Sequence, residues 1–376
     1  MAPPAPLPLW LDSPSRFAAW RRPAARIGLV LLLLLVAASF LALRVAEPAA
    51  LGAEAATSAP SEQTDLALYE KIVSAVKGGD NYYTAAADAL RAGSYPLRPF
   101  LTFRLPALAT VLAALPGWAP RYLLWLLAFV TALAWALRLA AALPRLAPRL
   151  VTSLLIAGSM LAFIQPGLVA FHEVWAGLLV ALSLAIRRPG HWVEAVAIGL
   201  AAMLIRETAT LYAVVMALAA WREGERREAW GWGAALLLFA AMLGFHAWAV
   251  AGVTGPNDPA SPGWMGLQGY GLFVKAVTLA TALQLLPLAA AAPLVALAMF
   301  GWASWRDPLG TRMFGLLTAY ALAIGLFARL DTFYWGLMPA PIFLAGLAFV
   351  PDGLRDLVRQ SLAPGKPRIT VTRLAR

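Results

Sequence analysis

The residues of this chain that could do chemistry lie near the ends of its apolar stretches, mostly at one face of the expected membrane domain. They are acids, cations, amides and one histidine: Asp80, Arg98, Arg104, Gln165, His172, Glu173, Arg206, Glu207, Asn257, Asp258, Lys275, Arg329 and Asp331. A charged group in hydrocarbon costs about 2.5–3.5 kcal/mol on insertion scales, so several at one face need a common reason. A polar cavity that opens at that face is the simplest one.

Residues of these types can act as bases and as ligands for anions. An ionised carboxylate, with an ordinary pKa of about 3.9 for Asp, can accept the proton of an attacking hydroxyl. Arginine stabilises a departing phosphate through bidentate contacts. Because phosphate is a stable leaving group, no general acid is required. Direct displacement assisted by one carboxylate base would invert the attacked carbon.

The composition places the chain in a lipid membrane. Its 376 residues are 61% hydrophobic and 13% charged, with a mean hydropathy of +0.72, which is more apolar surface than a soluble domain can hide. Cysteine is absent, which excludes disulfides and thiolate metal sites. The three histidines have no ligand spacing, so we expect no metal and no cofactor. The net charge of +11 falls largely at segment ends, where it indicates membrane topology rather than nucleic acid binding.

Hydropathy predicts an all-α, polytopic membrane helix bundle with about ten transmembrane helices. The apolar runs are 27–43, 121–142, 150–165, 168–186, 192–206, 208–221, 229–252, 272–302, 310–328 and 333–350. Several are close to the lower limit for crossing about 30 Å of hydrocarbon. The first follows a cluster of arginines, and no clean cleavage site closes it, so we expect an uncleaved span.

Basic residues in short loops set the predicted orientation, with both termini in the cytoplasm. This arrangement holds only if the segment 99–115 does not cross, so we expect a re-entrant or interfacial helix there, on the outer face. The predicted organisation is a cytoplasmic segment 1–26, a transmembrane domain 27–350 with a first periplasmic loop 47–120, and a basic tail 351–376 against the anionic inner leaflet.

The first outer loop carries two predicted short helices in "YEKIVSAVKGGDNYYTAAADALRAGSYP". Gly78 and Gly79 join them, and Gly93 followed by Pro96 ends the second. Asp80 stands where it could cap the second helix. Asp88 and Arg91 are spaced to pair on its surface.

A cytoplasmic N-terminus, one span and then a long outer loop with an acid and amphipathic helices resembles the GT-C glycosyltransferases. These multi-span enzymes use polyprenyl-phosphate-linked sugars. Two stretches are similar to that superfamily: "RPFLTFRLPAL" (98–108), where members carry a Pro-rich start to a membrane helix, and "GLAAMLIRETATLY" (199–212), where a charged pair often interrupts the sixth and seventh spans. Asn81 follows Asp80 in place of a second acid, which argues against the metal-dependent members.

The resemblance implies an inverting hexosyl- or pentosyltransferase on the periplasmic face of a bacterial inner membrane. Its partners would be a polyprenyl-phosphate-linked sugar donor, a lipid or glycan acceptor and membrane lipids. The expected base is Asp80, with Glu173 and Asp331 in reserve. The expected donor-phosphate ligands are Arg206, Lys275 and Arg329. Expected substrate-binding residues are Tyr82, Tyr83, Arg98, Arg104, His172, Glu207, Asp331, Tyr334 and Trp335.

Several of these residues also have a simpler, purely structural explanation. Glu173 could be neutralised by an arginine in a structural network, and Lys275 could snorkel to the interface. Arg206 and Glu207 could merely mark a turn, since adjacent residues point apart on a helix. Aromatic residues such as Tyr334 and Trp335 are ordinary at membrane interfaces. The segment 254–271, rich in Gly and Pro, could be a cover for the site or an inert connection.

The sequence is also compatible with other functional classes. A lipid-linked glycan polymerase or ligase also carries arginines and long outer loops, although its key loops tend to follow later spans. A transporter or flippase of lipid-linked precursors would predict paired half-chains and polar residues near mid-membrane. Neither feature is found in this sequence. A non-catalytic scaffold in an envelope complex is the last alternative.

Overall fold

A computed structural model describes residues 7–46 and 65–363, and these form an all-α structure. The first part of the predicted outer loop (47–64) and the second half of the basic tail (364–376) lie outside the described residues. The α-helices are α1 (Arg22–Ser39), α2 (Asp65–Lys77), α3 (Tyr82–Ala92), α4 (Pro106–Ala114), α5 (Ala119–Ala140), α6 (Leu146–Ser159), α7 (His172–Ile186), α8 (Val193–Ile205), α9 (Thr210–Glu223), α10 (Arg226–Ala251), α11 (Gly269–Ala280), α12 (Leu288–Ser304), α13 (Pro308–Phe327) and α14 (Val350–Leu362).

The expectation of about ten transmembrane helices is wrong, because fewer helices are long enough to cross a membrane. Among the described residues, four helical stretches are long and apolar enough to cross a membrane, namely Arg22–Arg44, α5, α10 and α13. A fifth is counted if Leu330–Leu337 and Ala340–Leu362, bent by 65°, form one broken span. These helices make the chain a multi-pass membrane protein.

Helix breaks inside the apolar runs explain the difference. The run 272–302 folds as α11 and α12, separated by Thr281 in extended conformation, a short 3₁₀ turn and Pro287. The run 192–206 ends at Arg206, whose φ of −142° and ψ of 115° leave the helical region. A helix of 13 residues, such as α8, is only ~20 Å long, against about 30 Å of hydrocarbon. Hydropathy alone does not register such breaks.

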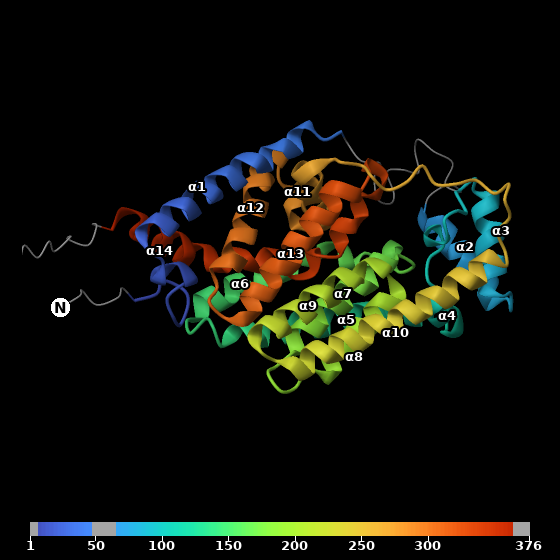
Figure 1. The fold of residues 1–376 in the computed structure, drawn as a ribbon, viewed down its shortest axis with the longest axis horizontal. Coiled ribbons are helices and arrows are strands. Elements are labelled where there is room, and N and C mark those ends of the chain that lie inside the picture. Colours follow the sequence, from blue (N-terminus) through green and yellow to red (C-terminus); the bar gives the residue numbers. More distant parts are fainter. Residues whose placement is uncertain (1–6, 47–64, 364–376) are drawn as a thin grey trace, which may run out of the picture.

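Different elements lie at the two ends of the molecule's long axis (Figure 1). We call the end that carries α2, α3 and α4 the loop end. We call the end that carries residues 7–21 and α14 the terminal end. At the terminal end, the carboxylate of Asp352 accepts hydrogen bonds from the backbone N–H groups of Leu9, Trp10 and Leu11. This contact fastens the N-terminal segment to α14.

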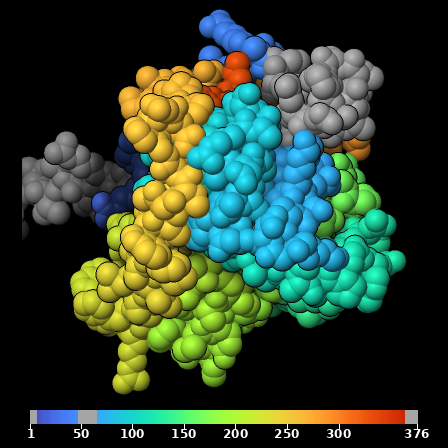
Figure 2. Space-filling model, turned by 90° about the vertical axis from the view of Figure 1, so that its right-hand side faces the viewer, coloured from blue at the N-terminus to red at the C-terminus, as the bar shows by residue number. Residues whose placement is uncertain are grey.

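The helices of the loop end form a cap over the bundle. The two short helices predicted in the first loop are confirmed as α2 and α3, and Gly79 between them adopts a φ of +104° that favours glycine. Seen along the long axis, α2 and α3 cover the middle of this end, beside the segment that follows α10 (Figure 2). The guanidinium of Arg91 binds the carboxylate of Asp258 at 2.8 Å, which ties α3 to that segment.

Helix α7 forms the centre of the core. Nearly all of its residues are buried, and it packs against α5, α8 and the segment 330–349. Gly177 permits one of these contacts, because a Cβ there would lie 2.6 Å from the backbone oxygen of Leu337. The close approach brings the aromatic segment that contains Tyr334 and Trp335 alongside the helix that carries His172 and Glu173.

Candidate functional site

Two arginines and two glutamates meet under the cap at the loop end. Glu173 lies in the first turn of α7, and Arg206 follows the last residue of α8. Nε of Arg206 lies 2.5 Å from Oε1 of Glu173, and the Arg206 guanidinium also contacts Glu207. Arg104, from the connection between α3 and α4, places Nη1 3.9 Å from Oε1 of Glu207. We call these four residues the outer-loop cluster, since they lie beneath the predicted outer loop.

Two members of the outer-loop cluster are fully buried and two are partly exposed. The side chains of Glu173 and Arg206 are 0% and 1% exposed, that of Arg104 is 14% exposed, and that of Glu207 is 22% exposed. Removing an ion from water costs several kcal/mol even in a pair, unless hydrogen bonds complete its coordination. The carboxylate of Glu207 is therefore where the cluster meets solvent.

Hydrogen bonding in the outer-loop cluster is incomplete. Of the twelve buried side-chain polar atoms without a hydrogen-bond partner in the described residues, seven lie in or beside it. The approach of Arg206 to Glu173 is close, yet it lacks the direction of a hydrogen bond, because Nε and both carboxylate oxygens remain unpartnered. The seven atoms are both ring nitrogens of His172, both carboxylate oxygens of Glu173, Nε of Arg206, Oγ1 of Thr208 and Nε1 of Trp335. Because buried polar groups are nearly always paired, this concentration points to a binding site.

Aromatic residues position the two arginines. Nε of Arg104 donates to the hydroxyl of Tyr69 at 2.9 Å, and its Nη2 donates to the hydroxyl of Tyr334 at 3.3 Å. The hydroxyl of Tyr82 donates to the backbone oxygen of Arg104 at 2.6 Å. Burial raises the pKa of Tyr69 to about 12, so its phenol is neutral at physiological pH. The guanidinium of Arg206 lies 6.0 Å from the centre of the Trp335 ring.

A small cavity adjoins Arg104 beneath α2 and α4. Its volume is about 10 Å³, which is room for about one water molecule. The ring of His172 reaches it and packs edge-on against that of Tyr69, with ring centroids 4.9 Å apart. The lining residues are Tyr69, Ile72, Val73, Tyr82, Arg104, Leu108, Ala109, Leu112, Ala170 and His172.

The structure brings together eight of the residues expected from sequence to form a site. Arg104, His172, Glu173, Arg206, Glu207, Tyr82, Tyr334 and Trp335 lie in the cluster or in its aromatic frame. Arg206 and Glu207 do lie where the chain turns between α8 and α9. Their side chains nevertheless contact each other rather than point apart, because the helix ends between Ile205 and Arg206. Tyr69 and Thr208 were missed. In sequence, Tyr69 belongs to the apolar face of α2 with Leu68 and Ile72, and no signal separates it from them.

Asp80 lies apart from this cluster. It is exposed in the turn before α3, and the N-cap of α3 is its neighbour Asn81, whose side chain accepts a hydrogen bond from the backbone of Tyr83. The expectation that Asp80 caps the helix is therefore wrong. The predicted pair of Asp88 and Arg91 is confirmed, at 3.7 Å.

The remaining residues that the sequence predicts for the site contact other parts of the protein, outside the outer-loop cluster. Nζ of Lys275 donates to the backbone oxygens of Val45 and Ala46 at 2.9 and 3.1 Å, next to the end of the first span. Arg329 and Asp331 pair with each other at 2.8 Å beside the segment 262–268. Nε of Arg98 donates to the backbone oxygen of Asp258, and the hydroxyl of Tyr83 lies 3.2 Å from Nδ1 of His246.

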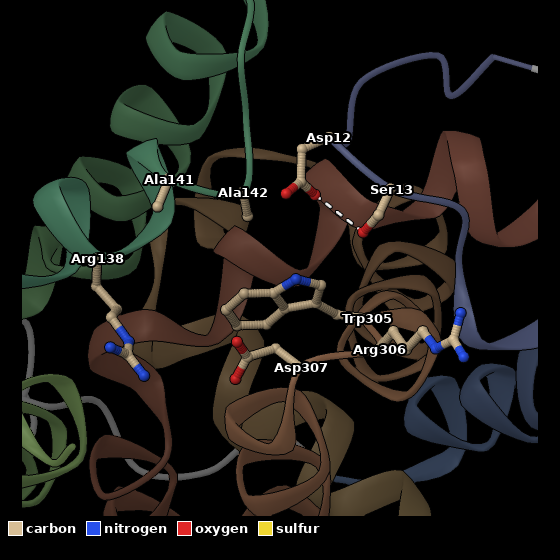
Figure 3. Close-up of a pocket in the computed structure, with 8 residues that line it drawn as sticks. All are labelled: Asp12, Ser13, Arg138, Ala141, Ala142, Trp305, Arg306 and Asp307. Atoms are coloured by element: carbon tan, nitrogen blue, oxygen red, sulfur yellow. Dashed lines mark hydrogen bonds between the residues drawn. The ribbon is translucent and has the colours of Figure 1, made fainter. Parts of the chain in front are cut away.

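A larger hollow of about 330 Å³ lies at the terminal end (Figure 3). Arg138 and Arg306 lie on opposite sides of the Trp305 ring and do not converge on a common point. The carboxylate of Asp307 caps the N-terminus of α13, where it accepts a hydrogen bond from the backbone N–H of Leu309. This hollow, and one of about 700 Å³ beside Arg329 and Asp331, are both roomier than the cavity beside Arg104. The polar groups of the terminal-end hollow are spread apart, and Arg329 and Asp331 pair with each other. We place the candidate site at the outer-loop cluster.

A second buried ion network lies between α7, α9, α10 and α13. Arg312 donates to Glu228 at 2.7 Å and to Glu223 at 2.6 Å, and Arg187 donates to Glu228 at 2.5 Å. We call these four residues the inner network. None of their side-chain polar atoms is among the unpartnered ones of the described chain. In the same described residues, no three His, Asp or Glu side chains converge as ligands for a metal ion.

Comparison with known protein families, with curated proteins and with solved structures finds no match for this chain. The candidate site therefore rests on its own geometry.

Proposed function

We propose that the chain is an inverting glycosyltransferase that moves a sugar from a polyprenyl-phosphate donor to a lipid or glycan acceptor. The observation that carries this proposal is the outer-loop cluster, which holds two guanidinium groups, two carboxylates and several unpartnered polar atoms beneath amphipathic helices. In this proposal the loop end faces the periplasmic side of a bacterial inner membrane. The architecture of the first loop, which resembles that of GT-C glycosyltransferases, supports the same assignment.

Arg104 and Arg206 would hold the donor phosphate. In the donor, the phosphate is a diester with one negative charge. When its bond to the sugar carbon breaks, it leaves as polyprenyl phosphate with a second charge. Arginine stabilises such developing charge through bidentate hydrogen bonds, most strongly where water is excluded. Both guanidinium groups now contact the carboxylate of Glu207, which occupies the position proposed for the phosphate.

Glu207 is the proposed base. A phosphate that binds both arginines displaces the Glu207 carboxylate, which is the most exposed member of the cluster. The freed carboxylate then accepts the proton of the acceptor hydroxyl, whose oxygen attacks the sugar carbon opposite the departing phosphate. The glycosidic bond that forms is inverted at this carbon. Glu173 remains buried and holds Arg206 in place. Asp80 takes no part, because it is exposed outside the cluster.

A transfer assay tests this proposal. The full chain, purified into lipid nanodiscs, is incubated with polyprenyl-phosphate-linked hexoses or pentoses and with lipid or glycan acceptors. We expect transfer with inversion, detected as product mass and by NMR of the anomeric proton. Glu207→Gln should reduce the rate by about 10²–10⁴-fold, whereas the matched change Asp80→Asn should leave it unchanged.

Each outcome of the assay bears on a different part of the proposal. No transfer from any of these donors would overturn the enzyme class. Full activity of Glu207→Gln would remove Glu207 as the base, and loss of activity in Asp80→Asn would move the site to the turn before α3.

Cysteine labelling tests the orientation, because the chain has no cysteine of its own. Gly117→Cys and Arg306→Cys place single thiols at exposed positions of the two ends. In intact spheroplasts, an impermeant maleimide should label only the thiol at position 117. Labelling only at position 306 would invert the proposed topology.

A further inference from the structure

Among the polar residues that line the cavity beside Arg104, His172 alone has no hydrogen-bond partner. Most of its lining is apolar, from α2 and α4. Of its polar members, the hydroxyl of Tyr82 donates to a backbone oxygen and that of Tyr69 accepts from Arg104. His172 is 3% exposed, yet neither of its ring nitrogens has a partner. A buried imidazole has one donor and one acceptor in its neutral form, so both remain available to a ligand.

The cavity also limits what His172 can bind. Its volume of about 10 Å³ accommodates one oxygen atom the size of a water molecule. A hydroxyl group fits this space, and it can both accept from and donate to an imidazole. An acetamido group has four heavy atoms and would collide with the apolar side chains of α2 and α4.

The position of the cavity points to the sugar of the donor. Arg104 lines it and belongs to the proposed phosphate site. A group that reaches His172 while its phosphate contacts Arg104 must be attached directly to that phosphate. In a polyprenyl-phosphate sugar, the sugar ring and the lipid chain are attached there, and only the ring carries hydroxyls.

We propose that His172 binds a hydroxyl of the donor sugar and thereby selects sugars with a free hydroxyl over those with an acetamido group at the same position. This inference rests on the proposed function. It narrows the donor class to polyprenyl-phosphate hexoses or pentoses without N-acetyl substitution at that carbon.

Histidine NMR tests the contact without any turnover. The chain has only three histidines, so the full chain with ¹⁵N-labelled histidine in nanodiscs gives three ring signals. His191→Gln and His246→Gln assign them. Addition of a polyprenyl-phosphate hexose should shift the His172 nitrogens, whereas polyprenyl phosphate without sugar should leave them in place. A shift with polyprenyl phosphate alone, or none with a hexose donor that demonstrably binds, would overturn the inference.

Kinetics with two donors test the selectivity. The wild-type chain should prefer a polyprenyl-phosphate hexose over the matching N-acetylhexosamine by at least about tenfold in kcat/KM. His172→Ala should lower kcat/KM for the hexose by roughly tenfold through loss of the hydroxyl contact. Because it also enlarges the cavity, the variant should raise the relative rate with the N-acetylhexosamine. His191→Ala, at an exposed histidine of the terminal end, is the control.

The two proposals fail separately. If His172→Ala lowers the rates with both donors by the same factor, His172 has a structural role and the selectivity inference is wrong, while the enzyme class stands. If the wild-type chain transfers neither sugar, the proposed function fails and the inference fails with it.

Discussion

The molecule contains two buried ion networks that differ in how completely they are hydrogen-bonded. In the inner network, Glu228 is 0% exposed and accepts from Arg187, Arg312 and the indole of Trp232. In the outer-loop cluster, Glu173 is also 0% exposed, yet both of its oxygens lack a hydrogen-bond donor. The two networks have the same residue types and similar burial, so composition does not distinguish them.

The difference separates a structural network from a candidate binding site. A buried ion pair is stable only when its remaining polar atoms are satisfied, which the inner network achieves with its own side chains. In the outer-loop cluster, Arg206 and Glu173 form an ion pair without a hydrogen bond, and further donors and acceptors lack partners beside the partly exposed carboxylate of Glu207. Substrate atoms could supply these missing partners. The inner network should therefore contribute to stability, and the outer-loop cluster to activity.

Removal of Arg312 should give the largest loss of stability. Arg312→Ala removes one of the two arginines that bind Glu223 and Glu228, and breaking a buried pair in this way costs about 3–5 kcal/mol. Thermal or denaturant unfolding of the purified protein measures the change. Arg306→Ala, at a neighbouring exposed arginine, should leave the free energy of unfolding nearly unchanged. Equal effects of the two variants would contradict a stabilising role for the inner network.

Replacement of Arg206 should affect activity rather than stability. Arg206→Lys keeps the positive charge near Glu173 but removes bidentate contact with phosphate. Loss of one such stabilising group typically lowers kcat by about 10²–10³-fold. We expect a fall of this size in the transfer assay, with much less destabilisation than in Arg312→Ala. If Arg206→Lys transfers at the wild-type rate but unfolds as easily as Arg312→Ala, both networks serve stability alone.

The smallest expected effect concerns the surface pair of exposed Arg91 and partly exposed Asp258, which lies outside both networks. Hydrogen bonds from Arg91 and from the backbone of Gly255 lower the pKa of Asp258 to about 2. Because this folded-state pKa lies below the ordinary value of about 3.9, the stabilisation is present above pH 4 and is lost as pH falls through about 2. The protection of residues 252–260 against hydrogen exchange, relative to the intrinsic rate, should be constant from pH 8 to 4 and should decrease at lower pH.

The variant Asp258→Asn serves as the reference for this pH dependence. It should show less protection than the wild-type chain above pH 4 and no corresponding step at low pH. The same step in both proteins would assign the transition to another group.

Local sequence signals identified the helices of the first loop and many residues of the cluster. Gly78, Gly79 and Gly93 correctly marked the limits of α2 and α3, because glycine is favoured where a helix ends. His172, Glu173, Arg206 and Glu207 were recognisable because polar groups are costly among apolar runs. The number of spans was overestimated, because hydropathy sums side chains and does not show where the backbone leaves the helical conformation, as at Arg206.

By itself, the sequence determined that the chain is helical, that it belongs in a membrane, and that it carries buried charge near segment ends. These properties follow from composition and local spacing. Only the tertiary structure decided which charges meet, because Arg104, Glu173 and Arg206 come from three separate segments. It also separated Glu207, in contact with two arginines, from Asp80, exposed in a turn. Hydrogen-bond satisfaction depends on these long-range contacts, so the contrast between the two ion networks cannot be read from sequence.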